Sequence, residues 1–215
     1  MPIYQLVDQL VFPDPNQANE DGLLAVGGDL SEDRLVKAYK SGVFPWFSEG
    51  EQILWWSPNP RFVLFPRELK VAKTLKKEIR KKNFRITFNE AFDEVIEYCA
   101  NVKRKDQQGT WITEEMKTAY SNLHKKGVAI SVEAWQGKEL VGGLYGLRLG
   151  HVYFGESMFS IMSNASKVAF VALMKKLQEE KCQVIDCQVF TEHLQSFGAR
   201  MIPRDQYLNL LDKNI

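Results

Sequence analysis

Beyond residue 128 the sequence switches repeatedly between the two-residue period of strands and the 3.6-residue period of helices. Residues 129–135 and 140–148 are typical of strands, and they flank Gln136-Gly137, which is a turn signal of a hairpin. Apolar residues at helical spacing after Asn164 predict a long helix over 165–180. The predicted order is three strands, a helix, a strand, a helix, a strand and a last helix: 129–135, 140–148, 151–156, 165–180, 184–189, 192–197, 199–202 and 205–212.

This order predicts an α+β fold in which a meander of three strands is followed by a helical crossover to a further strand of a mixed sheet. Such a layout is typical of the acetyltransferase-like (GNAT-like) fold. A coenzyme A enzyme of that layout has a glycine-rich loop before the long helix, where pyrophosphate binds backbone N–H groups. The corresponding segment 162–167 contains no glycine. The loop therefore argues against coenzyme A, and it leaves an acyl-transfer scaffold in place.

The first 67 residues differ from the rest, because they are rich in turn-forming residues and in aromatic residues. One helix is expected there, beginning after Ser31 and ending near Gly42. We therefore predict a small N-terminal α/β domain over 1–67 and the acetyltransferase-like domain over 68–215. The aromatic side chains of the first part form either a core or a stacking platform for a flat ligand such as a base. They are Phe44, Trp46, Phe47, Trp55 and Trp56.

A basic segment stands out because the whole chain is nearly neutral, with 28 Lys and Arg residues against 27 Asp and Glu residues. Residues 70–85 contain eight basic residues and one Glu, a net charge of +7. Apolar residues at spacing four predict a helix over 68–83 with a basic outer face. That face is either simply solvated or binds a phosphate backbone. The candidate phosphate contacts are Lys73, Lys76, Lys77, Arg80, Lys81, Lys82 and Arg85.

Two polar groups fall on otherwise apolar predicted strands. Glu156 lies within 154–160, and on a regular strand it would share one face with Met158 and Ser160. Asp186 and Gln188 share one face of the strand 184–189. A buried carboxylate is costly unless it is paired, so each is either a satisfied structural group or part of a reacting centre. Glu156 suits a substrate ammonium, and the other two suit the holding or deprotonation of a nucleophile.

The chain resembles the leucyl/phenylalanyl-tRNA–protein transferase family over nearly its whole length. The motifs that carry this resemblance occur in the expected order and are long and unusual: Gly22–Ser31, Gly42–Phe47, Ile53–Arg61, Gly109–Thr113, Leu140–Gly146, Phe154–Ser160, Asn164–Lys167 and Ile185–Gln188. The resemblance departs from the family pattern at Asn59, where the family has Asp, and at Ile130, where it has His.

The resemblance implies an aminoacyltransferase of the N-degron pathway. Such an enzyme moves Leu or Phe, and less well Met, from aminoacyl-tRNA to the N-terminal α-amine of a protein that starts with Arg or Lys. It implies that Glu156, Asp186 and Gln188 lie at the reacting centre. The residues implied or inferred to bind the terminal adenosine and the aminoacyl group are Trp46, Trp111, Leu144, Tyr153, Met158, Ser160 and Ile185.

The reaction is the aminolysis of an ester that is already activated, so we expect neither a cofactor nor a metal. Gln188 cannot act as a base, and Asp186 is a weak one. The hypothesis is that Asp186 orients Gln188, which holds the amine, while Asp186 or the substrate ribose assists proton removal. We expect a cytoplasmic monomer without a membrane partner. The alternatives are an acyl-coenzyme A N-acetyltransferase and an RNA-binding module without activity.

Overall fold

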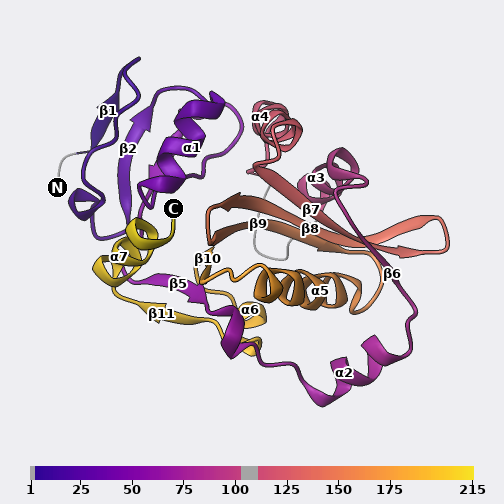
Figure 1. Ribbon diagram of the computed structural model, residues 1–215. Coiled ribbons are helices and arrows are strands. Elements are labelled where there is room, and N and C mark those ends of the chain that lie inside the picture. The colour runs from indigo at the N-terminus through magenta and orange to yellow at the C-terminus, as the bar shows by residue number, and fades with distance from the viewer. Residues whose placement is uncertain (1–2, 103–110) are drawn as a thin grey trace.

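A computed structural model describes residues 3–102 and 111–215 of the chain, which contain two mixed sheets (Figure 1). The larger sheet has seven strands in the order β11-β5-β10-β9-β8-β7-β6. Only β9 and β10 pair in parallel, and the other neighbours are antiparallel. The strands are β5 (Arg61–Leu64), β6 (Arg85–Phe88), β7 (Ala129–Gln136), β8 (Glu139–Leu149), β9 (Val152–Ser160), β10 (Val184–Gln188) and β11 (Arg200–Ile202).

Helices cover both faces of this sheet. The long helix α5 (Ala165–Glu179) packs on β7, β8 and β9 from one side. Two helices, α3 (Phe92–Asn101) and α4 (Glu114–Lys125), pack from the other side (Figure 1). With α6 (Glu192–Ser196) and α7 (Arg204–Asn214), every element predicted after residue 128 is confirmed. The largest shift is in β9, which continues four residues beyond its predicted end to Ser160.

The N-terminal part is more regular than its sequence suggests. It contains a four-stranded mixed sheet in the order β1-β2-β4-β3, beside the predicted helix α1 (Glu32–Lys40). These strands are too short to show an alternating pattern: β1 (Tyr4–Leu6), β2 (Leu23–Gly27), β3 (Phe44–Pro45) and β4 (Leu54–Trp56). Single 3₁₀ turns lie at Pro15–Gln17 and Pro66–Glu68. Strand β5 falls within residues 1–67, yet it pairs with β10 and β11 in the larger sheet.

The basic helix is shorter than the predicted span 68–83. Helix α2 runs over Lys73–Arg80, and residues 69–72 before it belong to no helix. The Lys70 N–H donates to the carbonyl oxygen of Phe197 at 2.9 Å, a contact with the end of α6 that holds this stretch away from the helix. Within α2 only Leu75 is buried, and the helix projects from the rest of the molecule (Figure 1).

An irregularity in β9 corrects one prediction about side-chain direction. The pairing of β8 with β9 shifts register between Tyr145 and Gly146, which inserts one extra residue into β9. As a result Glu156 points towards α1 and α4, whereas Met158 packs in the apolar cluster on the α5 side. The Ser160 hydroxyl also meets the start of α5, where it accepts the Ser166 N–H at 3.3 Å. The three side chains therefore do not share one face.

Candidate active site

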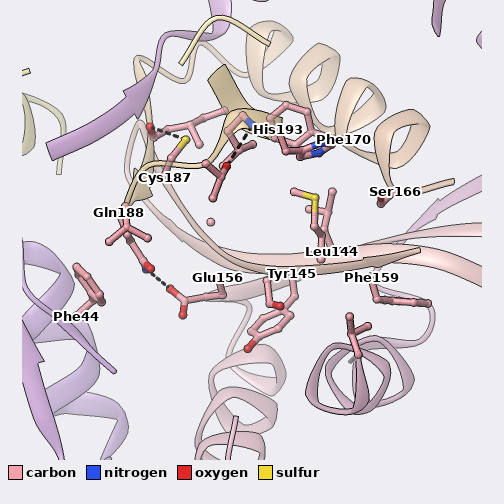
Figure 2. A pocket seen from close by; sticks show the side chains of 18 of the residues that line it. Phe44, Leu144, Tyr145, Glu156, Phe159, Ser166, Phe170, Cys187, Gln188 and His193 are labelled. Atoms are coloured by element: carbon pink, nitrogen blue, oxygen red, sulfur yellow. Dashed lines mark hydrogen bonds between the residues drawn. The ribbon is translucent and has the colours of Figure 1, made fainter. Parts of the chain in front are cut away.

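A cavity of about 840 Å³ opens where β9 and β10 stop pairing, beyond Phe154 and Asp186 (Figure 2). Its walls come from β3, β8, β9, α5, β10 and α6, and from Trp111 just before α4. Of the ten residues that the sequence assigns to the reacting centre or to substrate binding, nine line this cavity. They are Trp46, Trp111, Leu144, Tyr153, Glu156, Met158, Ser160, Ile185 and Gln188. Asp186 does not line it. Gly109 and Thr110, from the same motif as Trp111, lie outside the described residues.

The carboxyl group of Glu156 joins the polar side chains on one side of the cavity. It accepts hydrogen bonds from the Tyr39 hydroxyl at 2.7 Å, the Tyr120 hydroxyl at 3.2 Å and the Gln188 amide Nε2 at 2.9 Å (Figure 2 shows the last). Burial, assisted by the negative charge of Asp186, raises the pKa of Glu156 to about 8, although the three donors oppose this. A carboxyl with such a pKa changes its charge within the physiological range.

Asp186 lies behind this wall and is fully buried. Its two carboxylate oxygens accept from Arg61 Nε at 2.8 Å and Nη2 at 2.7 Å, and the Tyr207 hydroxyl donates to it at 2.7 Å. It also accepts the backbone N–H of Gln188 at 2.9 Å. Gln188 has a positive φ of 62°, so this bond fixes a backbone turn that a regular strand lacks. Asp186 thus holds the residue that reaches the cavity.

The aromatic residues of the N-terminal part divide between the two alternatives that the sequence leaves open. Phe44, Phe47 and Trp55 are buried in the core. Trp46 is half-buried and lines the cavity, and its ring centroid lies 6.0 Å from that of Trp56. Phe44 does both, because it also lines the cavity. One part of the cluster is therefore core, and the other part can stack on a flat ligand.

Sequence reasoning missed the residues that support the polar groups. Tyr39 and Tyr120 come from α1 and α4, and their hydroxyls also bond to each other. Both sit at apolar positions of amphipathic helices, so the sequence offers no sign that separates them from core residues. Arg61 is the last residue of the motif Ile53–Arg61, so its place in that motif could have marked it as a candidate site residue. His193 of α6 lines the cavity opposite Glu156 (Figure 2), and burial together with Lys167 lowers the pKa of its imidazole.

The seven basic residues assigned to phosphate contacts are all exposed: six lie on α2 or directly after it, and Arg85 begins β6. None of them lines the cavity. Lys81 pairs with Glu78 at 3.0 Å, and Arg85 pairs with Glu90 at 3.1 Å. No helix within residues 3–102 and 111–215 combines the length and apolarity needed to cross a bilayer. Over the same described ranges, no three His, Cys, Asp or Glu side chains gather in a way that could hold a metal ion.

Fold and site together define the class: a mixed α/β enzyme whose cavity offers a carboxyl and a primary amide beside a large apolar space. A family model described as "Leucyl/phenylalanyl-tRNA protein transferase" matches residues 63–212, and the model of that family's N-terminal domain matches residues 28–59. The chain therefore belongs to the leucyl/phenylalanyl-tRNA–protein transferase family. It is an aminoacyl-tRNA–protein transferase.

Curated relatives agree with the family models. The transferase of Flavobacterium johnsoniae is 54% identical over 209 residues, which cover 97% of this chain and 99% of the relative. That of Syntrophobacter fumaroxidans is 54% identical over 215 residues, covering 100% and 92%. Among solved structures, a conserved protein of unknown function from Bacteroides thetaiotaomicron aligns at a TM-score of 0.45 and 13% identity, covering 64% of this chain and 53% of that one.

Proposed function

We propose that this enzyme transfers Leu or Phe, and less well Met, from aminoacyl-tRNA to the N-terminal α-amine of proteins that begin with Arg or Lys, as a step of the N-degron pathway. The observation that carries the proposal is one cavity in which Glu156 and Gln188 face an apolar space. The carboxyl and amide suit an ammonium and an amine, and the apolar space suits the aminoacyl side chain. The relatives' names, which refer to leucyl- and phenylalanyl-tRNA, support the same donors.

For the donor, we propose that Trp46 and Trp111 contact the terminal adenosine of the tRNA, since indole rings stack on bases. Leu144, Tyr153, Met158 and Ile185 then surround the aminoacyl side chain, with Ser160 at the edge of the cavity. An apolar slot discriminates by about 1–3 kcal/mol per methylene, so tolerance of Met beside Leu is expected.

The chemical step is the attack of an amine on an ester carbonyl. An α-amine has a pKa of about 7.7–8, so roughly a tenth to a sixth of it is neutral at pH 7. Deprotonation therefore costs only about 1 kcal/mol, whereas correct orientation supplies about 7–11 kcal/mol. This comparison favours a site that mainly positions its substrates.

We assign the positioning to Gln188: one N–H of its amide donates to Glu156, and its amide carbonyl oxygen can accept an N–H of the incoming amine. Glu156 holds a substrate ammonium, which favours the ionised carboxylate. Asp186, engaged by Arg61 and Tyr207, fixes Gln188 from behind rather than taking the proton itself. The departing ribose oxygen or water then receives the proton.

For the tRNA body, we propose phosphate contacts along α2. The support is an exposed row of cations on a helix that carries no cavity residue. Such contacts bind without reading the base sequence. The aminoacyl-tRNA would then extend across the molecule from α2 to the cavity.

At the level of the whole chain, we propose an acetyltransferase-like (GNAT-like) arrangement for residues 68–215. It is supported by the meander β7-β8-β9, the crossover helix α5 and the parallel strand β10. Residues 1–67 are then the N-terminal domain, which supplies aromatic side chains to one wall of the cavity. We further propose a cytoplasmic monomer, because aminoacyl-tRNA is a cytoplasmic substrate and the cavity is built from one chain.

One transfer assay tests this function. The purified protein is mixed with labelled Leu-tRNA and two peptides, one starting with Arg and one with the same Arg N-acetylated. We expect label on the free-amine peptide alone. Tight tRNA binding without any transfer would favour the RNA-binding alternative, and transfer of acetyl groups from acetyl-coenzyme A would favour the acetyltransferase alternative. Either result would overturn the proposal.

A further inference from the structure

Two apolar side chains at the mouth of the cavity, Val189 and Phe190, are exposed to solvent. Both line the cavity, yet Val189 is 39% exposed and Phe190 is 48% exposed. The Phe190 ring packs against the buried ring of Phe62, with the centroids 5.4 Å apart. The proposed transfer step uses neither residue. Apolar surface left in water beside a binding site favours any apolar group that covers it.

The backbone holds this apolar rim in a fixed position. The Val189 N–H donates to the Cys187 carbonyl oxygen at 2.8 Å, which closes a three-residue turn centred on Gln188 and its positive φ of 62°. On the other side of Phe190, the Thr191 hydroxyl caps the start of α6. The rim therefore lies between a closed turn and a helix cap, and little further ordering is needed when a ligand covers it.

The acceptor chain reaches this rim when its amine lies at the Gln188 amide oxygen. Val189 and Phe190 are one and two residues further along, at most about 7 Å of extended chain. Consecutive Cα atoms of the acceptor are about 3.8 Å apart, so its second residue comes within the same reach. The terminal adenosine of the donor is assigned to Trp46 and Trp111, which belong to other segments of the cavity wall.

We propose that Val189 and Phe190 form a subsite for the second residue of the acceptor protein, and that this subsite favours a large apolar side chain. This inference rests on the proposed function. The charge of the segment fits a peptide better than RNA, because the chain contains no Lys or Arg between Lys181 and Arg200. An apolar second residue removes the rim from water, whereas a polar residue of the same size has to lose its own hydration to do so.

The test compares two acceptor peptides that begin Arg-Leu and Arg-Asn and are otherwise identical, because Leu and Asn side chains are similar in shape. With Leu-tRNA as donor, the wild type should show a kcat/KM about 3- to 20-fold higher for the Arg-Leu peptide. Phe190→Ala should lose most of this preference. The ratio of the two values does not depend on the folded fraction of the enzyme. Leu10→Ala, at an exposed apolar residue that does not line the cavity, is the control and should keep the wild-type ratio.

A second variant and three contrary results make the test decisive. Phe190→Leu keeps an apolar side chain and should retain part of the preference, and a complete loss in this variant would contradict the inference. Equal kcat/KM values for the two peptides in the wild type would overturn it while leaving the proposed function intact. If Phe190 stacks on a tRNA base instead, Phe190→Ala raises the KM for Leu-tRNA and leaves the peptide ratio unchanged, which also overturns it. A wild type that transfers leucine to neither peptide overturns the proposed function itself.

Discussion

Glu156 is held between two opposed effects, and the balance decides its charge. Three hydrogen-bond donors favour the carboxylate, whereas burial and the nearby Asp186 favour the neutral acid. The outcome is a pKa of about 8, well above the value of about 4.3 expected for Glu in an unfolded chain. Binding of a cationic substrate group would lower the pKa of Glu156 again, because it stabilises the charged carboxylate.

The raised pKa makes the stability of the wild type depend on pH. Between about pH 4.3 and pH 8 the native state keeps a proton that the unfolded state releases, so the stability falls as the pH rises. Glu156→Gln has no such proton. We expect the unfolding free energy of Glu156→Gln, minus that of the wild type, to rise with pH by at most about 1.4 kcal/mol per unit.

Denaturant unfolding at a series of pH values measures this difference. Glu133→Gln is a useful comparison, because Glu133 is buried in the same sheet but does not line the cavity. A difference between Glu156→Gln and the wild type that stays flat from pH 5 to pH 8 would mean that Glu156 titrates normally and that its environment is more polar than the contacts imply.

Asp186 is predicted to act by charge and position together. Asp186→Asn leaves the buried guanidinium of Arg61 without its counterion, which costs about 3–5 kcal/mol of unfolding free energy. It also weakens the anchor of the Gln188 backbone, so the single-turnover rate of transfer should fall at saturating substrate. Stopped-flow or quench measurement on the folded fraction checks this. An unchanged single-turnover rate would contradict the positioning role, and Arg61→Lys is the control for the ion pair alone.

How much of the site the sequence can predict depends on the kind of residue. Glu156 and Gln188 are recognisable because a polar side chain on an otherwise apolar strand is costly to bury unless it has a partner. Tyr39 and Tyr120 are not, because a tyrosine on the inner face of a helix looks like any core residue until the fold brings both hydroxyls to Glu156. The direction of Met158 is also unpredictable, since it depends on one extra residue in β9.

At the scale of elements, predictability mostly follows length and period, although the three-residue strand β11 was also predicted. Helix α5 and strands β7 and β8 extend over enough residues for their periods to be read, and all were predicted. Strands β1, β3 and β4 contain two or three residues each, so no local pattern marks them. The four-stranded sheet of the N-terminal part is therefore a property of tertiary packing.

Helix α2 is the element for which the clearest functional prediction can be made. Replacing Lys76, Lys77 and Arg80 by Gln should weaken tRNA binding and make it less sensitive to salt. Each lost phosphate contact should reduce the slope of log affinity against log salt by about 0.7–0.9. The KM for the acceptor peptide should not change, because α2 contributes nothing to the cavity wall. Filter binding or fluorescence anisotropy across a salt series measures the slope.

A variant with the same change in charge controls for the overall field. Lys125, Lys138 and Lys213 are exposed on α4, at the β7–β8 turn and on α7. Their replacement by Gln should leave the slope nearly unaltered. If both triple variants lose affinity equally, the protein attracts tRNA through its general charge, and α2 is not a docking element.

At the scale of the whole molecule, the two sheets share one apolar core. Leu24, Tyr39 and Trp55 of the first part belong to the same buried cluster as Tyr145 and Phe154 of the larger sheet. The C-terminal helix α7 adds hydrogen bonds to the N-terminal part. Arg204 of α7 donates to the Ser57 carbonyl oxygen at 2.6 Å and to the Asn16 side chain at 3.2 Å.

The shared core predicts that residues 1–67 do not fold alone. Isolated, this fragment would expose the cluster side of Tyr39 and Trp55 and leave β5 without β10 and β11. Chains of about 60 residues bury too little surface to absorb such a loss. We expect the fragment to show no cooperative transition by circular dichroism, whereas the full chain unfolds in a single step. A cooperative transition in the fragment would mean that its sheet is self-sufficient, and that the aromatic wall of the cavity is assembled by docking two independent domains.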